Sequence, residues 1–125
     1  MFADKPAAAT VAVKDIKKAS EFYERTLGLK ATGKGEPSVR TYRTGGSTLL
    51  VYQSKFAGTN QATSATWLVG DEVDAIARDL KAKGVRFEHY DMPDTTLQGD
   101  VHVSGDMRVA WFRDLDGNIL SIVSG

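Results

Sequence analysis

The sequence predicts an α+β fold made of two βαβββ modules, and three observations support this prediction. The stretch Arg108–Val123 is predicted to be a hairpin, because two apolar runs flank the turn-forming residues 114–118. Two segments carry apolar residues at helical spacing, and an apolar strand pattern precedes each of them. The two halves also match at a single offset of 56 residues, at Val13 and Val69, Asp15 and Asp71, and Gly28 and Gly84.

The first module covers about residues 7–53. Asp15 is the predicted N-cap of its helix, since a carboxylate accepts hydrogen bonds from the free N–H groups of a first turn. Gly28 is predicted to end that helix, because glycine adopts a positive φ angle without steric cost. The expected elements are a strand over 7–13, a helix over 16–27, a strand over 29–32, a loop over 33–37 and a hairpin of strands 39–43 and 47–53.

The second module covers about residues 65–124 and follows a polar linker, 54–64. Asp71 is the predicted N-cap of its helix, and Gly84 is predicted to end the helix. The expected elements are a strand over 65–69, a helix over 72–83, a strand over 85–90, an irregular loop over 91–107 and the closing hairpin. The loop contains Gly99 and Gly105 and is a candidate lid over a ligand pocket.

The two modules are expected to form a single domain, residues 1–125. A sheet with a helix on one face leaves its other face open. Two such mixed sheets that pair edge to edge form a curved, open trough with the helices on the outer face, and the trough is the natural place for a ligand. Ser121 is a small polar residue among aliphatic ones, so the face that it shares with Ile119 and Val123 is expected to border something other than packed core.

The composition is that of an ordinary globular protein, with 42% hydrophobic and 26% charged residues. Sixteen basic residues balance sixteen acidic ones, which argues against nucleic-acid binding. No apolar stretch is long enough for a membrane span, and the N-terminus does not have the pattern of a signal peptide. The chain contains no cysteine, which excludes disulfides and thiolate metal sites and fits a reducing cytoplasm, the expected location.

Three motifs cover almost the whole chain in order: Val13–Leu29 with Phe22-Tyr23 and Leu27-Gly28-Leu29, Glu72–Val85, and Ala110–Asn118 with Asp116-Gly117-Asn118. Together they resemble the vicinal oxygen chelate superfamily, which groups glyoxalase I, bleomycin-resistance proteins, fosfomycin-resistance enzymes and extradiol dioxygenases. Leu115 departs from the family pattern, which usually has proline in this turn.

The resemblance implies three metal-ligand positions, a histidine at the start of each module's first strand and a glutamate on the last strand. In this chain they fall on Ala8, on Ser64 or Ala65, and on Ser121. A methyl group cannot bind a metal, and a neutral hydroxyl is a poor substitute for a carboxylate. We therefore expect no metal and no other cofactor. His89 and His102 are expected in surface or hydrogen-bonded roles, since they would need a nearby carboxylate such as Asp100 to bind a metal.

The candidate ligand-binding side chains of the trough are strand residues with aromatic rings or polar tips: Arg40, Tyr42, Tyr52, Trp67, Tyr90, Trp111 and Ser121. Packing beneath the helices is an equally good interpretation for each strand aromatic, because aromatic rings dominate cores. Ser121 as a catalytic nucleophile is disfavoured, since no histidine can be placed beside it.

The leading hypothesis is a metal-free protein, similar to the bleomycin-resistance branch, that sequesters a small, planar or aromatic molecule in the trough. The resemblance also implies a homodimer. The alternative is a lyase, isomerase or oxygenase of the same superfamily that uses other metal ligands or an acid–base pair such as Tyr90 with Asp91. An interaction module with a filled trough and no ligand is a third hypothesis.

Overall fold

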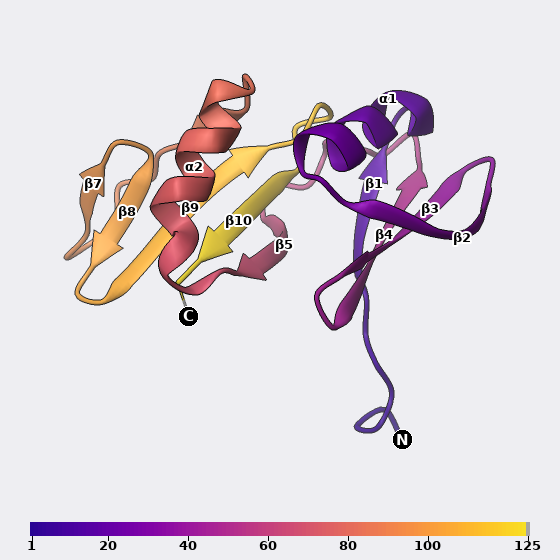
Figure 1. Cartoon of the computed structure of the whole chain (residues 1–125), viewed down its shortest axis with the longest axis horizontal. Coiled ribbons are helices and arrows are strands. Elements are labelled where there is room, and N and C mark those ends of the chain that lie inside the picture. Colours follow the sequence, from indigo (N-terminus) through magenta and orange to yellow (C-terminus); the bar gives the residue numbers. More distant parts are fainter. Residues whose placement is uncertain (125) are drawn as a thin grey trace.

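The computed structural model describes residues 1–124, and for residues 34–36 the backbone alone; residue 125, the end of the predicted domain, lies outside the described residues. The chain forms two open, mixed sheets, each with a helix (Figure 1). The linker between them connects strand β4 (Ser47–Gln53) to strand β5 (Thr63–Leu68). This arrangement confirms the predicted α+β class.

The first module forms a four-stranded sheet in the order β1-β4-β3-β2, in which β1 is parallel to β4. Its helix is followed directly by a π-helical segment. The elements are β1 (Ala9–Val13), α1 (Ile16–Glu21), the π-helical segment (Phe22–Thr26), β2 (Lys30–Glu36), β3 (Val39–Thr44) and β4 (Ser47–Gln53).

The second module forms a six-stranded sheet in which β5-β10-β9-β8-β7 is the main path and β6 also pairs with β9. A short 3-10 turn, Gly70–Glu72, leads into its helix. The elements are β5 (Thr63–Leu68), α2 (Val73–Ala82), β6 (Arg86–Glu88), β7 (Thr96–Gln98), β8 (Val101–Ser104), β9 (Met107–Arg113) and β10 (Ile119–Val123).

The predicted helix boundaries are confirmed at three of four ends. The Asp15 carboxylate accepts hydrogen bonds from the N–H groups of Lys17 and Lys18, at 3.0 and 3.2 Å. Gly28 and Gly84 both adopt positive φ angles, 75° and 86°, where the chain leaves the helices. The predicted N-cap Asp71 is wrong, because this residue lies inside the 3-10 turn that precedes α2.

The prediction of an irregular loop over residues 91–107 is also wrong for about half of that segment. Residues 96–104 form the hairpin β7–β8, and β8 pairs with β9 as part of the sheet. Val101 and His102 on β8 are buried. This segment is therefore built into the sheet and is not a lid. Strand β2 is likewise longer than expected and extends through the predicted loop to residue 36.

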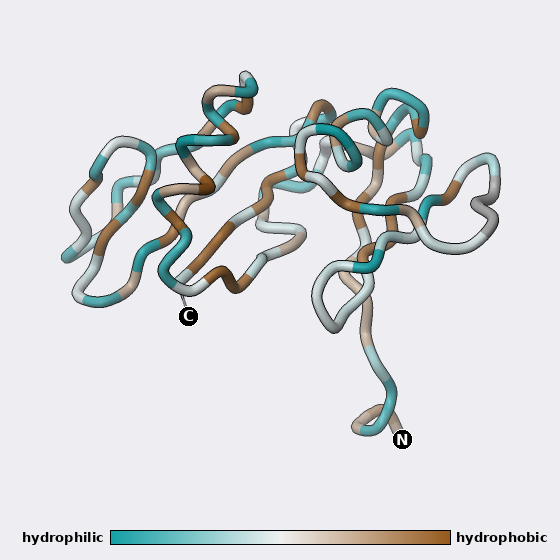
Figure 2. The backbone as a smooth tube through the Cα atoms, viewed as in Figure 1, coloured by the Kyte–Doolittle hydropathy of each residue, from teal (hydrophilic) through white to brown (hydrophobic). Residues whose placement is uncertain are grey.

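One face of each sheet packs against the helices, and we call the other the open face. On β10, Leu120 and Ile122 belong to the helix-side core, whereas Ser121 lies on the open face, as the alternation predicts. On β9 the core residues are Ala110 and Phe112. Figure 2 shows that β10 is mostly hydrophobic along its length, whereas hydrophobic and hydrophilic residues alternate along α2. A single core cluster includes the helix sides of both modules.

The turn between β9 and β10 joins the modules. The Asp114 carboxylate accepts hydrogen bonds from the N–H groups of Asp116 and Asn118 within the turn, at 2.9 and 2.8 Å. It also accepts one from the Tyr23 hydroxyl of the first module, at 2.7 Å. The Asn118 amide donates to the Ala12 carbonyl of β1, also at 2.7 Å. Burial and the neighbouring Asp114 carboxylate both raise the pKa of Tyr23, so its hydroxyl keeps the proton that it donates.

We predict that Tyr23→Phe lowers the free energy of unfolding by about 1.5–3 kcal/mol, because it removes one hydrogen bond to a buried carboxylate. Urea denaturation measures the change. Tyr52→Phe is the matched control; Tyr52 is 39% exposed, so the same deletion should stay within about 0.5 kcal/mol. Equal losses in the two variants would contradict the role of the Asp114 turn.

Candidate functional site

The open face of the second module carries a row of side chains across four strands. Thr66 on β5 pairs with Ser121 on β10, Ser121 with Trp111 on β9, and Trp111 with Glu88 on β6. The Thr66 and Ser121 hydroxyl oxygens lie 2.7 Å apart and share a hydrogen bond. The row therefore places hydroxyl groups directly beside an indole ring.

Trp111 and two neighbouring rings form a cluster on this face. Tyr90 and His102 both meet Trp111 edge to face, with ring centroids 5.0 and 4.9 Å away and interplanar angles of 83° and 80°. Tyr90 also stacks on His102, with centroids 6.3 Å apart. Edge-to-face and stacked pairs fix the orientation of the rings. The cluster is a rigid aromatic wall, of which Tyr90 is 39% exposed.

His102 is the buried member of this aromatic wall. Its Nε2 atom accepts a hydrogen bond from the backbone N–H of Tyr90, at 2.9 Å, so the ring proton is on Nδ1. Within the described part of the chain, Nδ1 is buried without a hydrogen-bond partner. The prediction of a hydrogen-bonded role is thus correct for one ring nitrogen. Sequence reasoning missed the strand that positions it, although glycines bracket the short alternating stretch Val101–Ser104.

The predicted trough residues divide between the two faces. Tyr90, Trp111 and Ser121 lie on the open face of the second module, and Tyr52 lies on that of the first, paired with Ala12 of β1. Their use by a ligand remains a prediction.

Arg40, Tyr42 and Trp67 do not lie on the open face, so their expected place in the trough is corrected. Arg40 and Tyr42 pair with Val51 and Leu49, which are core residues beneath the helices. Tyr42 is fully buried, and its hydroxyl donates to a Glu24 oxygen at 3.0 Å; burial raises its pKa. Trp67 pairs with Ile122 on the helix side of the second sheet. Successive residues of a strand point to opposite faces of the sheet, and the sequence carries no signal that shows which face these three positions occupy.

The family's metal-ligand positions do not fit a divalent metal in this chain. Ala8 directly precedes β1, and the alternation of that strand places this position on the open face. Its side chain, however, is only a methyl group. Ala65 pairs with Leu120 and faces the helix-side core, so the position that opposes Ser121 is Thr66, not Ala65. Thr66 and Ser121 supply neutral hydroxyls that already bind one another. The residues present therefore do not replace two histidines and a glutamate.

The two histidines do approach one another, with ring centroids 6.1 Å apart. The His89 Nε2 atom lies 2.8 Å from an Asp100 oxygen, and the His89 and Lys81 hydrogen bonds lower the pKa of Asp100 against the effect of its burial. His102 directs Nε2 at the Tyr90 N–H and so offers that atom to no metal. Among the side chains that the structure describes, no three His, Cys, Asp or Glu residues gather closely enough to hold a metal ion.

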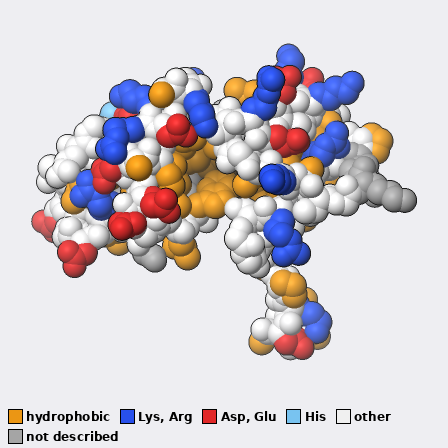
Figure 3. Space-filling model, viewed as in Figure 1, with side chains coloured by type: hydrophobic (Ala, Val, Ile, Leu, Met, Phe, Trp, Pro, Cys, Tyr) orange, Lys and Arg blue, Asp and Glu red, His pale blue; other side chains and the backbone are white. Residues whose placement is uncertain are grey.

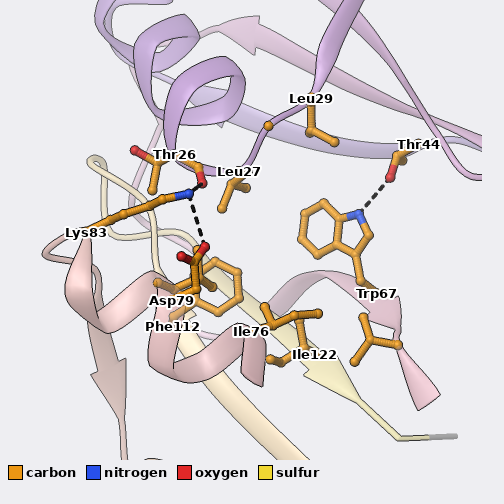
Figure 4. A pocket seen from close by; sticks show the side chains of 13 residues that line it. Thr26, Leu27, Leu29, Thr44, Trp67, Ile76, Asp79, Lys83, Phe112 and Ile122 are labelled. Carbon is orange, nitrogen blue, oxygen red and sulfur yellow. Dashed lines mark hydrogen bonds and ion pairs between the residues drawn. The ribbon is translucent and has the colours of Figure 1, made fainter. Parts of the chain in front are cut away.

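A pocket of about 310 Å³ lies on the helix side, between the two modules. Figure 3 shows hydrophobic side chains in the hollow between the modules. In Figure 4, Trp67 lies at one end of the pocket and Lys83 at the other. The lining residues come from the first module, from α2, β5, β9 and β10, and from the residues that directly follow β5 and α2: Thr26, Leu27, Gly28, Leu29, Thr44, Trp67, Val69, Ile76, Asp79, Leu80, Lys83, Phe112 and Ile122.

Solved structures of similar fold cover almost the whole chain. An integron cassette protein from the mobile metagenome of the Halifax Harbour sewage outfall has a TM-score of 0.72 at 19% identity, covering 98% of this chain and 99% of its own. The fosfomycin resistance protein FosX from Listeria monocytogenes has a TM-score of 0.72 at 18% identity, with 98% and 92% coverage. The lactoylglutathione lyase from Agrobacterium tumefaciens has a TM-score of 0.71 at 16% identity, with 96% and 92% coverage. At these identities the likeness concerns the fold alone.

The search of curated proteins found no match. No helix among the described residues is long and apolar enough to cross a membrane. The family model of the glyoxalase/bleomycin resistance protein/dioxygenase superfamily matches residues 5–122, nearly the full sequence. This match agrees with the two-module fold and with the three sequence motifs. The chain belongs to the glyoxalase/bleomycin resistance protein/dioxygenase superfamily.

Proposed function

We propose that this protein binds a small, planar or aromatic molecule on the open faces of its sheets, without a metal ion, and sequesters it unchanged. The aromatic wall of Tyr90, His102 and Trp111 is the observation that carries this proposal. Flat apolar surface with a few fixed polar groups is typical of small-molecule sites. The absence of cysteine from the sequence supports a reducing cytoplasm as the location.

The polar groups beside the wall suit a neutral or weakly polar ligand. The Thr66 and Ser121 hydroxyls share one hydrogen bond, which leaves one hydroxyl proton and further lone pairs for a ligand. Glu88, at the other end of the row, forms an ion pair with Arg113, so its charge is already balanced. Stacking on the exposed Tyr90 ring and hydrogen bonds to the hydroxyls would act together on a ring that carries polar substituents.

A second copy of the chain is the proposed cover for the open face. Leu68 continues the open face of β5 beyond Thr66 and is 74% exposed. Leu97 pairs with His102 and is 44% exposed, and Tyr90 adds a further exposed ring. These exposed apolar groups are spread across one face, from β5 at one end of the strand order to β7 at the other, and such a face favours an interaction surface. Membership of a superfamily that often forms dimers supports a homodimer whose subunits cover one another's open faces.

The alternative activity, that of a lyase, isomerase or oxygenase, has less support from the residues of this chain. The family's ligand positions hold a methyl group and hydroxyls, as described above. The proposed acid–base pair, Tyr90 with Asp91, is exposed, so water competes for its hydrogen bonds. Sequestration needs neither a metal ligand nor a proton-transfer pair.

We predict that an antibiotic with a planar aromatic group binds through Trp111, with bleomycin as the first probe because it carries a planar bithiazole group. The chain has two tryptophans, and each indole N–H gives its own peak in a ¹H–¹⁵N spectrum. The Trp111 peak should shift on titration, and Trp111→Ala should weaken binding by about tenfold, the loss of about 1.4 kcal/mol of ring contact. Phe56→Ala, at a 66% exposed ring in the linker, is the control and should not change the affinity. A panel of such compounds that leaves the Trp111 peak in place would count against this site.

We predict that the untagged protein, dialysed against zinc and manganese ions, retains far less than one metal ion per chain by mass spectrometry. The variant Ala8→His, Thr66→His, Ser121→Glu should retain about one zinc ion, because it restores three ligands on the open face. The matched variant with Ala65→His in place of Thr66→His should bind less zinc and unfold more readily, since that side chain faces the core. One metal ion in the wild-type protein would overturn the metal-free proposal.

We predict that the wild-type protein sediments as a dimer at micromolar concentration and that Leu68→Asp shifts it to monomer, because a charge would replace an exposed apolar contact. Analytical ultracentrifugation distinguishes the two states. Phe56→Asp introduces the same charge at another exposed apolar position and should remain dimeric. A monomeric wild-type protein would contradict the proposed cover.

A further inference from the structure

We propose that the pocket between the two modules is a second ligand site, separate from the open face, and that it takes a small, neutral, ring-containing molecule. Its volume of about 310 Å³ lies at the lower end of the range of about 300–1,000 Å³ for small-molecule pockets. The first module contributes Leu27 and Leu29 to one wall. Helix α2 contributes Ile76 to another, and Phe112 and Ile122 come from the sheet. Apolar side chains thus surround the space on several sides.

The Trp67 ring is already held in place for such a ligand. Its Nε1 atom donates a hydrogen bond to the Thr44 hydroxyl of the first module, at 3.0 Å (Figure 4). The polar atom of the indole is therefore satisfied, and the ring presents apolar surface to the pocket. The Thr44 oxygen accepts this bond and keeps its own proton, which it can donate to a ligand. A preorganised ring lowers the entropy cost of binding.

The opposite end of the pocket favours a neutral ligand. The Lys83 ammonium lies 3.1 Å from an Asp79 oxygen and 3.5 Å from the Thr26 carbonyl (Figure 4). Its charge is therefore balanced within the protein. An anionic group placed there would lie beside a carboxylate and a carbonyl oxygen, which would repel it. A single hydroxyl, amine or carbonyl group suits this end better.

The pocket and the open face lie on opposite sides of the same sheet. Ile122 lines the pocket, and its neighbour Ser121 lies on the open face of β10. The two tryptophans are divided in the same way: Trp67 lines the pocket and Trp111 belongs to the aromatic wall. Each indole peak therefore reports on one site. A ligand in the pocket would also contact both modules at once.

The test uses a neutral probe and its anionic analogue, N-phenyl-1-naphthylamine and 8-anilinonaphthalene-1-sulfonate, which differ by one sulfonate group. The neutral probe should shift the Trp67 indole peak saturably, whether or not the Trp111 peak also moves. Ile76→Phe, which fills the pocket, should weaken its binding about tenfold or more, a loss of about 1.4 kcal/mol. Ala75→Phe adds a ring on the exposed side of the same helix and should change the affinity less than about twofold. Leu29→Trp fills the pocket from the first module and is the second filling variant to test if Ile76→Phe is unstable.

The proposal is overturned if the Trp67 peak does not move, if the Trp111 peak moves in its place, or if both filling variants bind the probe as the wild type does. Equal affinity for the sulfonate analogue would overturn the neutral class of ligand. Failure at this pocket leaves the open-face proposal unaffected, because that proposal is read at Trp111 with a different ligand. Failure at Trp111 likewise leaves the pocket test intact.

Discussion

The carboxylate of Asp114 is the group on which the two-module structure depends. It accepts hydrogen bonds from two backbone N–H groups, from the Asn118 amide and from the Tyr23 hydroxyl. A buried carboxylate without such partners would be costly, so the turn and the first module stabilise one another. Asp116 extends the junction by accepting the Lys14 N–H, at 3.2 Å, although burial raises the pKa of its carboxyl. The modules are therefore joined by specific hydrogen bonds as well as by apolar packing.

Strand β10 separates two kinds of surface. Its helix-side residues, Leu120 and Ile122, belong to the core and to the wall of the pocket between the modules. Its open-face residue, Ser121, lies beside Thr66 and Trp111. The same strand thus supports the aromatic wall on one side and the pocket on the other. The two proposed sites differ in chemistry, because one offers hydroxyl groups and partly exposed rings and the other offers a mostly apolar wall with polar groups at its ends.

The repeated plan of the chain could be predicted from the sequence because its signals are local. The offset between the halves, the Asp15 cap and the glycines that end both helices depend on neighbouring residues alone. The hairpin β7–β8 was not predicted, since its strands are short and become regular only by pairing with β9. Asp71 resembled a cap, but a 3-10 turn moved the start of α2 beyond it.

Part of the candidate site was also predictable from local sequence signals. Ser121 could be placed on the open face, because the closing hairpin alternates without interruption. Tyr42 and Trp67 were assigned to the trough by residue type, whereas the pairing partner of each strand decided the face. The pocket between the modules could not be anticipated, since it brings Leu27 and Leu29 against α2, which is distant in sequence.

The junction at Asp114 has a consequence for the order of events at the ribosome. Tyr23 is synthesised 91 residues before the carboxylate that it contacts, and the Ala12 carbonyl precedes the Asn118 amide by 106 residues. Until these partners are synthesised, the Tyr23 hydroxyl and the Ala12 carbonyl of the nascent first module lack their native hydrogen bonds. Contacts so distant in sequence slow folding, because the loop must close before any of them is gained. During translation the first module therefore cannot complete its contacts with the closing turn until the last residues of that turn have been synthesised.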